Sequence, residues 1–221
     1  MRHLSRGQAL GALTLSSMII LSVGGIATTA YAQAAEQPTK TGAMVPTVGK
    51  TPGVGDTAAD FTLESLAGDK VKLSSETSKG PVVLVVLRGF PGYQCPLCTV
   101  QVGRLISDAP RFAAAKAKVI LVYPGPAESL KMRADEFVKG KMLPKNFTVL
   151  LDLDYKFTNQ YGLRWEAPNE TAYPSTFVMG PTRKVTFAKV SRSHGDRANN
   201  ADIIKALPTP KTGTGSKMSP S

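Results

Sequence analysis

The stretch "PVVLVVLRGFPGYQCPLC", residues 81–98, decides the fold class and contains both cysteines of the chain. Its first part, residues 81–87, is a continuous apolar run bounded by Gly80 and Gly89. A run of this kind is typical of a strand that is buried on both faces of a sheet. The sequence therefore predicts a central strand that leads into a segment with two cysteines.

The rest of the chain alternates between predicted strands and predicted helices. Strands are predicted at 81–87, 118–125 and 147–153, with a hairpin at 60–74 and an antiparallel pair at 174–180 and 183–190. Helices are predicted at 96–115, 127–140, 154–161 and 199–207. This order predicts an α/β fold in which helices flank a central mixed sheet, with the final hairpin at one edge of that sheet.

Length and composition indicate one globular domain with tails. The chain has 221 residues, of which 42% are hydrophobic and 19% charged, so that a proper core can form. Residues 33–52 are rich in Pro, Thr, Gly and Ala without apolar periodicity and are predicted to be a flexible linker. The tail 208–221 is equally low in complexity and is predicted to be disordered. The folded domain is expected to span 53–207.

The first residues have the pattern of a secretory signal peptide. Arg2 and Arg6 precede an apolar run at 9–27, and an A-x-A cleavage pattern ends at Ala32. The alternative, a membrane anchor, is less favoured because the run contains Gly, Ser and Thr throughout and ends at that cleavage pattern. We expect residues 1–32 to be removed, leaving no stable membrane insertion. The small-residue cleavage pattern indicates the periplasm or the exterior of a bacterium, where a cysteine pair is oxidised unless a reductant acts on it.

The surface is predicted to be basic without being a nucleic-acid site. The formal net charge is +11, and loss of Arg2 and Arg6 leaves 25 basic against 16 acidic residues. The basic residues are scattered, with no run longer than two and no interleaved aromatic stripe. Nucleic-acid binding is therefore not expected.

The two cysteines lie where the predicted strand turns into a helix. Pro96 suits the first helical position, which makes Cys95 the N-cap and places Cys98 in the first turn. Unpaired backbone N–H groups and the helix dipole stabilise a thiolate at this place. Cys98 also begins the apolar stripe that continues through Val102 and Leu105, so Cys95 is expected to be the more exposed cysteine.

Three kinds of chemistry fit a lone C-x-x-C pair. A zinc site needs four ligands, and His194 is the one other soft or imidazole ligand left after cleavage, so no metal is expected. A purely structural disulfide between Cys95 and Cys98 closes too short a loop to stabilise the fold much. A working thiol–disulfide centre is favoured. Motifs for flavin or nicotinamide are absent from the sequence, so no bound cofactor is predicted.

Residues 54–105, "VGDTAADFTLESLAGDKVKLSSETSKGPVVLVVLRGFPGYQCPLCTVQVGRL", resemble the start of a known family. The G-D-x-A-x-D-F-T-L, K-G-x-V-V-L and R-G…C-P-x-C patterns are similar to those of the peroxiredoxins, the alkyl hydroperoxide reductase/thiol-specific antioxidant family. "YPSTFVM", residues 173–179, fits as well. The resemblance extends over most of residues 54–207. It implies a thioredoxin-like fold and the reduction of peroxides by thiols.

The chain departs from the family at two positions and resembles a C-P-x-C variant. The family pattern of proline, hydroxyl residue and peroxide-attacking cysteine falls on Pro91, Cys95 and Cys98, so Cys95 replaces the hydroxyl. The family's thiolate-stabilising arginine falls on Pro174. Thioredoxin-type oxidoreductases instead have an exposed first cysteine, a buried second cysteine and a cis-proline, which Cys95, Cys98 and Pro174 match.

The resemblance therefore leaves three functions open, of which the first is preferred and the third is a binding protein that keeps the fold without turnover. In the first, the chain is an antioxidant enzyme that reduces peroxides, and attack starts at Cys98. In the second, it exchanges disulfides with envelope proteins, and attack starts at Cys95. Both schemes end in a Cys95–Cys98 disulfide that a thiol reductant, such as a thioredoxin-like donor protein, reopens.

Other residues near the pair are weaker candidates. Arg88 ends the buried strand, and its charge is a candidate to stabilise a thiolate in place of the missing arginine. Tyr93 and Gln94 occupy the approach to the cysteines and are candidates for contact with a partner. Trp165 is expected to pack in the core and His194 to lie on the surface.

Overall fold

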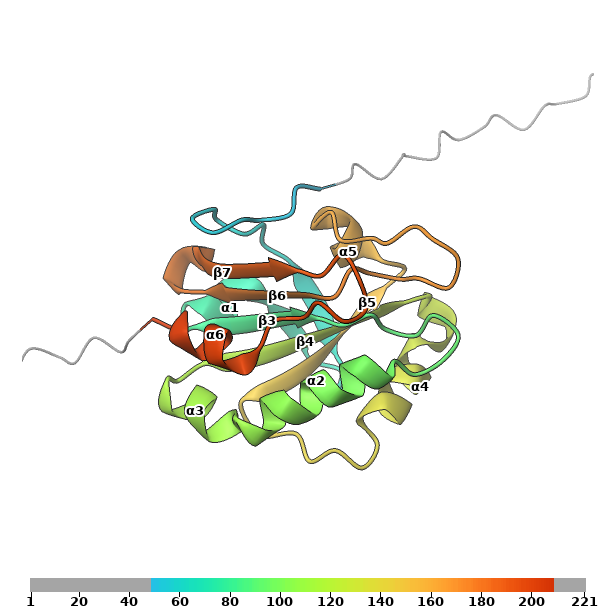
Figure 1. The fold of residues 1–221 in the computed structure, drawn as a ribbon, viewed down its shortest axis with the longest axis horizontal. Helices are drawn as coiled ribbons and strands as arrows, with labels where there is room; N and C mark the ends of the chain where they lie inside the picture. Colours follow the sequence, from blue (N-terminus) through green and yellow to red (C-terminus); the bar gives the residue numbers. More distant parts are fainter. Residues whose placement is uncertain (1–48, 209–221) are drawn as a thin grey trace, which may run out of the picture. The chain divides into compact units, whose positions relative to one another are not determined.

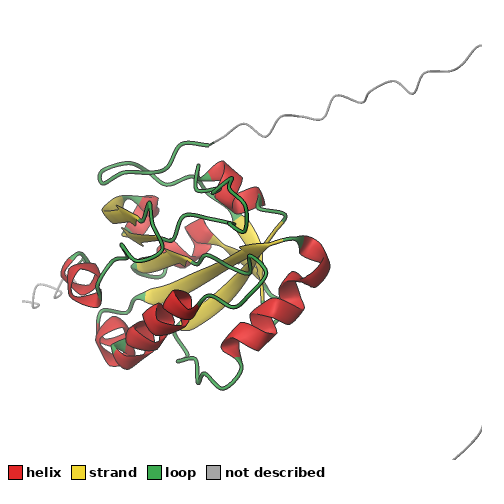
Figure 2. Ribbon diagram, turned by 45° about the vertical axis from the view of Figure 1, so that its right-hand side comes forward, coloured by secondary structure: helices red, strands yellow, loops and turns green. Residues whose placement is uncertain are grey.

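The computed structural model describes residues 49–208. A seven-stranded sheet in the order β2-β1-β5-β4-β3-β6-β7 forms its centre, with helices on both sides (Figures 1 and 2). The predicted signal peptide 1–32 and the tail from 209 onward lie outside the described residues, as does the linker up to residue 48. The predictions for these segments stay predictions.

The elements follow the predicted order along the chain. The strands are β1 (Thr62–Ser65), β2 (Lys70–Lys72), β3 (Val82–Val86), β4 (Lys118–Gly125), β5 (Phe147–Leu153), β6 (Ser175–Met179) and β7 (Val185–Val190). The helices are α1 (Leu73–Thr77), α2 (Pro96–Ser107), α3 (Ala109–Ala114), α4 (Ala127–Val138), α5 (Lys156–Gln160) and α6 (Asn200–Lys205), with a 3₁₀ turn η1 (Pro181–Arg183). The α/β class with a mixed sheet is thus confirmed.

The apolar run at 81–87 forms the central strand β3, as predicted. β3 pairs in parallel with β4 and antiparallel with β6, and every residue of β3 is buried. Its side chains alternate between the two faces of the sheet, so that Val83 and Val85 belong to one core cluster and Val82 and Leu84 to the other. A strand covered on both faces needs apolar residues at every position, which explains the continuous run.

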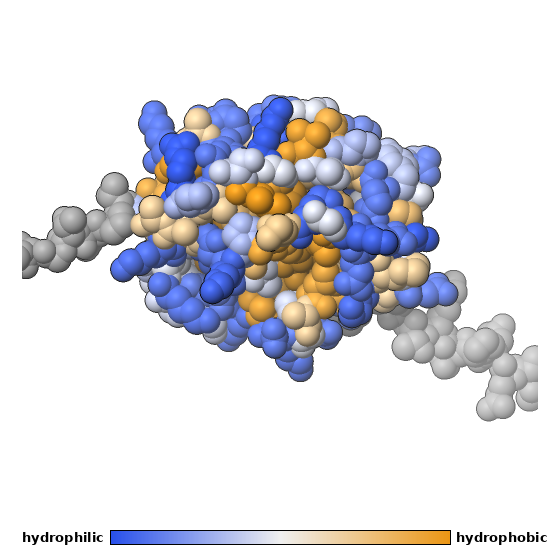
Figure 3. All heavy atoms as spheres, turned by 90° about the horizontal axis from the view of Figure 1, so that it is seen from below, coloured by the Kyte–Doolittle hydropathy of each residue, from blue (hydrophilic) through white to orange (hydrophobic). Residues whose placement is uncertain are grey.

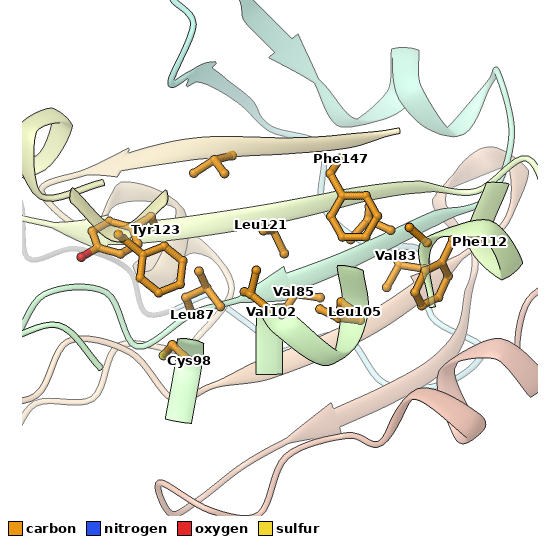
Figure 4. Close-up of a cluster of buried hydrophobic side chains, with 14 of the residues drawn as sticks. Val83, Val85, Leu87, Cys98, Val102, Leu105, Phe112, Leu121, Tyr123 and Phe147 are labelled. Carbon is orange, nitrogen blue, oxygen red and sulfur yellow. The ribbon is translucent and has the colours of Figure 1, made fainter. Parts of the chain in front are cut away.

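Two layers of helices cover the sheet. One core cluster joins the sheet to α2, α3, α4 and α6, and the other joins it to α1 and α5. Figure 4 shows the first cluster, in which Cys98 lies at one end of the buried side chains and Phe112 at the other. The cysteine therefore continues the apolar face of α2, whose buried residues include Cys98, Val102 and Leu105.

The predicted helix 96–115 is wrong, because two helices occupy this segment. α2 ends at Ser107, and α3 begins at Ala109 with a proline in its first turn. Pro110 has no backbone N–H, and its ring would clash with the carbonyl of residue 106 if the helix continued. The chain therefore leaves the helical path at Asp108, which caps both helices.

The predicted hairpins lie at opposite edges of the sheet. β1 and β2 pair antiparallel with Leu63 opposite Val71, which confirms the hairpin at 60–74, although the short helix α1 was not predicted. β6 and β7 pair antiparallel, and β7 is the outermost strand, as expected. β7 begins at Val185 rather than at 183, because η1 occupies the preceding residues.

Ordered contacts begin within the segment predicted as a linker. The Gly49 N–H donates to the Asn159 carbonyl at 2.9 Å, and the Thr51 hydroxyl donates to the Tyr161 carbonyl at 2.8 Å. A Cβ atom at Gly49 would lie 1.5 Å from the Gln160 carbonyl oxygen, so only glycine fits there. Among residues 49–208, no helix has the length and apolar character that a membrane crossing needs.

Candidate active site

The two cysteines lie at a tight connection between β3 and α2. Gly89 has a φ of +72°, and a Cβ atom there would lie 2.0 Å from the Pro124 carbonyl oxygen. Glycine is therefore required where the chain leaves the sheet. α2 then begins at Pro96 with Cys95 as its N-cap, as the sequence predicts.

Each of the two sulfur atoms accepts a hydrogen bond from one backbone N–H group. The Cys98 N–H donates to Cys95 Sγ at 3.2 Å, and the Arg88 N–H donates to Cys98 Sγ at 3.4 Å. Both thiols are free. Their residues are only 3% and 1% exposed, respectively, so Cys95 is not the clearly exposed partner that the sequence suggests.

The two thiols differ in their tendency to ionise. The Cys98 side chain is bonded to Cys95 Sγ, and this bond is the largest influence that lowers the pKa of Cys95. The Cys98 N–H and the charges of Arg197 and Arg88 lower it further. Together they outweigh the effect of burial and hold the pKa of Cys95 at about 6. Burial and the same bond raise the pKa of Cys98 well above its ordinary value. These surroundings favour the thiolate on Cys95 over the thiolate on Cys98.

The guanidinium that contacts the sulfurs belongs to Arg197. Its Nη1 lies 3.5 Å from Cys98 Sγ, and its Nη2 lies 3.6 Å from Cys95 Sγ. Nη1 also donates to Gln101 Oε1 at 2.6 Å. Arg197 follows β7 in a polar segment without periodicity, and sequence reasoning missed it. The absence of an arginine at Pro174 was the one hint that a cation had to come from elsewhere.

Arg88 contributes its backbone to the cysteines, while its side chain points elsewhere. The guanidinium donates to Glu170 at 2.5 and 2.9 Å and to the Tyr93 hydroxyl at 2.7 Å. The side chains of Arg88 and Glu170 are only 4% and 9% exposed. Burial alone would lower the pKa of Arg88, but the bonds to Glu170 and Tyr93 raise it, so the guanidinium stays charged. Its charge is a smaller influence on Cys95 than that of Arg197.

A model of the AhpC/TSA family matches residues 54–188. The chain belongs to the AhpC/TSA family. Membership makes it an oxidoreductase that works with thiols, and its fold is the thioredoxin-like fold of the peroxiredoxins. Comparison with curated proteins gives no match.

Solved peroxiredoxin structures support this assignment. The peroxidoxin BcpB from Mycobacterium tuberculosis is 27% identical, with a TM-score of 0.53 over 70% of this chain and 93% of that one. A thiol peroxidase from Chromobacterium violaceum is 20% identical, with a TM-score of 0.53 over 72% of this chain and 88% of that one. A peroxiredoxin-like protein from Aquifex aeolicus is 16% identical, with a TM-score of 0.56 over 72% and 87% of the two chains. The last two show a shared fold.

The two prolines singled out in the sequence, Pro91 and Pro174, both lie next to elements that carry this AhpC/TSA site. Pro91 is half-buried in the bend that precedes Cys95. Pro174 is buried and directly precedes β6, whose Ser175 pairs with Val86 at the end of β3. The Pro174 carbonyl accepts from the Ser191 N–H at 2.8 Å, which joins it to the segment that carries Arg197. A cis bond before Pro174 stays a prediction.

The other candidate residues frame the site. Tyr123 donates its hydroxyl to Gln94 Oε1 at 2.8 Å, and Gln94 Nε2 donates to the Arg133 carbonyl at 2.9 Å, so Gln94 ties the cysteine loop to α4. Tyr93 is 49% exposed. Trp165 is half-buried and stacks on Tyr173 at a centroid distance of 4.8 Å, rather than packing in the core.

A hollow of about 500 Å³ runs along α2 beside the site. It lies between α2 and residues 195–200, and Gln101 and Arg197 form its wall on the side of the sulfurs. Leu97 and Val100 line it and are 42% and 49% exposed. Apolar side chains gather on the face of the molecule that is seen from below (Figure 3). Within the described part of the chain, no group of three or more His, Cys, Asp or Glu side chains is arranged to hold a metal ion.

Proposed function

We propose that the chain reduces peroxides through a Cys95–Cys98 redox pair, as a C-P-x-C member of its family, and that the Cys95 thiolate attacks the peroxide. The observation that carries the proposal is the place of Cys95 as the N-cap of α2, where its sulfur faces the unpaired N–H groups of the first helical turn. Cys95 Sγ accepts from the Cys98 N–H and lies 3.6 Å from Arg197, which favours a thiolate on Cys95. This choice reverses the assignment that the family pattern implies, in which Cys98 attacks.

The first step oxidises Cys95. Its thiolate attacks one oxygen of the peroxide ROOH, so that an S–O bond forms and the O–O bond breaks. Sulfur gives up two electrons and becomes a sulfenic acid, and the RO⁻ leaving group takes a proton from water to become an alcohol. Arg197 lies where negative charge develops on the peroxide oxygens and is positioned to stabilise it.

The second step closes the disulfide. Oxidation removes the negative charge from Cys95, which, besides burial, helps to keep Cys98 protonated. The Cys98 sulfur then attacks the Cys95 sulfur, and the sulfenic hydroxide leaves as water with the Cys98 proton. A dithiol reductant of the thioredoxin type returns two electrons and two protons and restores both thiols.

Exchange with protein disulfides is the second candidate function. The placement of Cys95 at the start of α2, with a pKa of about 6, suits attack on a disulfide sulfur as well as on a peroxide. Buried Pro174 beside the end of β3 agrees with a thioredoxin-type site. The burial of both cysteines speaks against it, because a protein disulfide needs more access than a small peroxide.

A rapid-mixing experiment distinguishes the two functions. The fully reduced protein is mixed with hydrogen peroxide or with a small disulfide, and the fluorescence of Trp165 is followed. Trp165 is a suitable reporter because its ring centroid lies 5.1 Å from that of His194. His194 belongs to the segment that carries Arg197. We expect peroxide to oxidise the protein far faster than it oxidises a free thiol that is ionised to the same fraction. Oxidation by peroxide at the free-thiol rate, with rapid exchange against the disulfide, would establish the second function instead.

We also propose that the chain acts in the periplasm or outside a bacterial cell. Support comes from the positively charged start, the apolar run at 9–27 and the A-x-A pattern that ends at Ala32. Mass spectrometry of the envelope fraction of an expressing bacterium is expected to find a chain that begins near Gln33. An uncleaved chain in the cytoplasm would contradict the proposal.

A further inference from the structure

Arg197 is held in place by bonds to two different parts of the chain. Its Nε donates to the carbonyl of His194 at 2.9 Å, and its Nη1 donates to Gln101 Oε1 on α2 at 2.6 Å. An arginine side chain on a loop loses considerable rotamer freedom when it is fixed. The position of the guanidinium over the sulfurs therefore depends on the position of residues 191–197.

This segment is anchored through the side chain of His194. The His194 Nε2 lies 2.8 Å from Glu170 Oε1, and its ring lies 5.1 Å from that of Trp165. Glu170 in turn accepts two bonds from the buried guanidinium of Arg88. The contacts form a continuous chain from Arg88 through Glu170 and His194 to Arg197.

We propose that Glu170 and His194 are positioning residues that hold Arg197 against the two sulfurs and thereby favour ionisation of the cysteine pair. The proposal deepens the proposed function, since it assigns the residues that prepare its nucleophile. Neither residue touches the sulfurs, and neither lies in the sequence near the cysteines. The guanidinium that the family pattern lacks at Pro174 is thus supplied from the segment after β7 and kept there by a buried carboxylate.

The charges around this chain of contacts are suited to the role. Burial favours the neutral acid, but the bonds from Arg88 and His194 outweigh it and lower the pKa of Glu170, so the anchor is a carboxylate at neutral pH. On the outer side, Lys189 pairs with Asp196 at 2.7 Å and adds a second, exposed attachment of the same segment. An exposed pair contributes little, so the contact between His194 and Glu170 is the stronger of these two side-chain anchors, next to the backbone bond from Ser191 to Pro174.

The test measures how readily the Cys95 thiol ionises, independently of peroxide. The reduced full-length chain is alkylated with iodoacetamide at pH 4 to 9, and the modified cysteine is identified by mass spectrometry. Arg197→Met is expected to raise the Cys95 pKa, which slows alkylation at pH 6 roughly five-fold. His194→Ala and Glu170→Gln are expected to shift the profile in the same direction. Glu166→Gln, an exposed change in the same loop, is the matched control and should leave the profile unchanged.

A double variant separates positioning from a general structural effect. If His194 acts only through Arg197, His194→Ala has no further effect on the profile in an Arg197→Met background. Glu170→Gln leaves the buried Arg88 without its carboxylate and weakens the fold, whereas His194 is 45% exposed and its replacement is tolerated. His194→Gln, which keeps a donor, is expected to restore part of the wild-type profile.

Two results would overturn the proposal. One is a wild-type alkylation profile in His194→Ala while Arg197→Met shifts it, which would mean that Arg197 needs no anchor. The other is an equal effect of His194→Ala with and without Arg197. Failure of the proposed function would give a different result. The alkylation profiles of the variants would still be shifted, but peroxide would oxidise the wild-type chain no faster than it oxidises a free thiol.

Discussion

The depressed pKa of Cys95 has a consequence for the stability of the reduced protein. The pKa is about 6 in the folded chain and about 8.5 for an ordinary thiol in the unfolded chain. Because the folded pKa is the lower one, the stabilisation is fully present above pH 8.5 and is lost as the pH falls through 6. Integration over this window gives a contribution that rises by about 2 kcal/mol between pH 5.5 and pH 7.5.

The contribution is measured by comparing two proteins that differ only in this group. Cys95→Ser removes the thiol and keeps a good N-cap residue, so the rest of α2 is preserved. Urea unfolding of both chains in excess reductant gives their free energies of unfolding at the two pH values. Titrating groups that do not interact with Cys95 cancel in the difference, which is expected to grow by about 2 kcal/mol in favour of the wild type from pH 5.5 to 7.5. A difference that stays constant with pH would refute the assignment of the thiolate to Cys95.

Three further predictions concern the residues around the pair. Cys98→Ala removes the thiol donor and is expected to raise the pKa of Cys95, which slows its alkylation at pH 6. Gly89→Ala places a Cβ atom 2.0 Å from a backbone carbonyl at a positive φ and is expected to destabilise the fold by at least about 3 kcal/mol in urea unfolding. Arg88→Met leaves the Glu170 carboxylate with His194 as its remaining side-chain partner and is expected to cost about 3 kcal/mol, part of which returns in the double variant with Glu170→Gln.

Each of these predictions has a result that contradicts it. Unchanged alkylation in Cys98→Ala would mean that the Cys98 thiol does not donate to Cys95. The control for Gly89 is Gly92→Ala, where φ is +110° but no atom lies within 4 Å of the added Cβ, so a similar loss in both variants would remove the argument from close approach. A double variant no more stable than Arg88→Met would show that the loss of the guanidinium partner of Glu170 is not the cause.

The sequence predicts the fold well where the pattern is local and apolar. The run at 81–87 has apolar residues at every position because both faces of β3 are covered, and such a run is visible without a structure. The break after α2 was missed, because apolar periodicity continues across Asp108 and conceals the effect of Pro110. The short helix α1 has too few residues for a period to be recognised.

The site is predictable only in its local part. Two cysteines with a proline between them at a strand end form a short motif, and their place at the start of α2 follows from helix capping alone. Arg197, Glu170 and His194 come from two distant loops, and polar loop residues show no periodicity. Their convergence depends on the path of the chain after β7, which no local pattern specifies.

The claim that Cys95 attacks the peroxide is tested most directly by trapping the sulfenic acid. Reduced Cys95→Ser and Cys98→Ser variants are each exposed to one equivalent of hydrogen peroxide with dimedone, and the modified cysteine is identified by mass spectrometry. The account predicts rapid labelling of Cys95 in the Cys98→Ser variant and no rapid labelling of Cys98 in the Cys95→Ser variant. Rapid labelling of Cys98, with none on Cys95, would contradict it and restore the assignment implied by the family pattern.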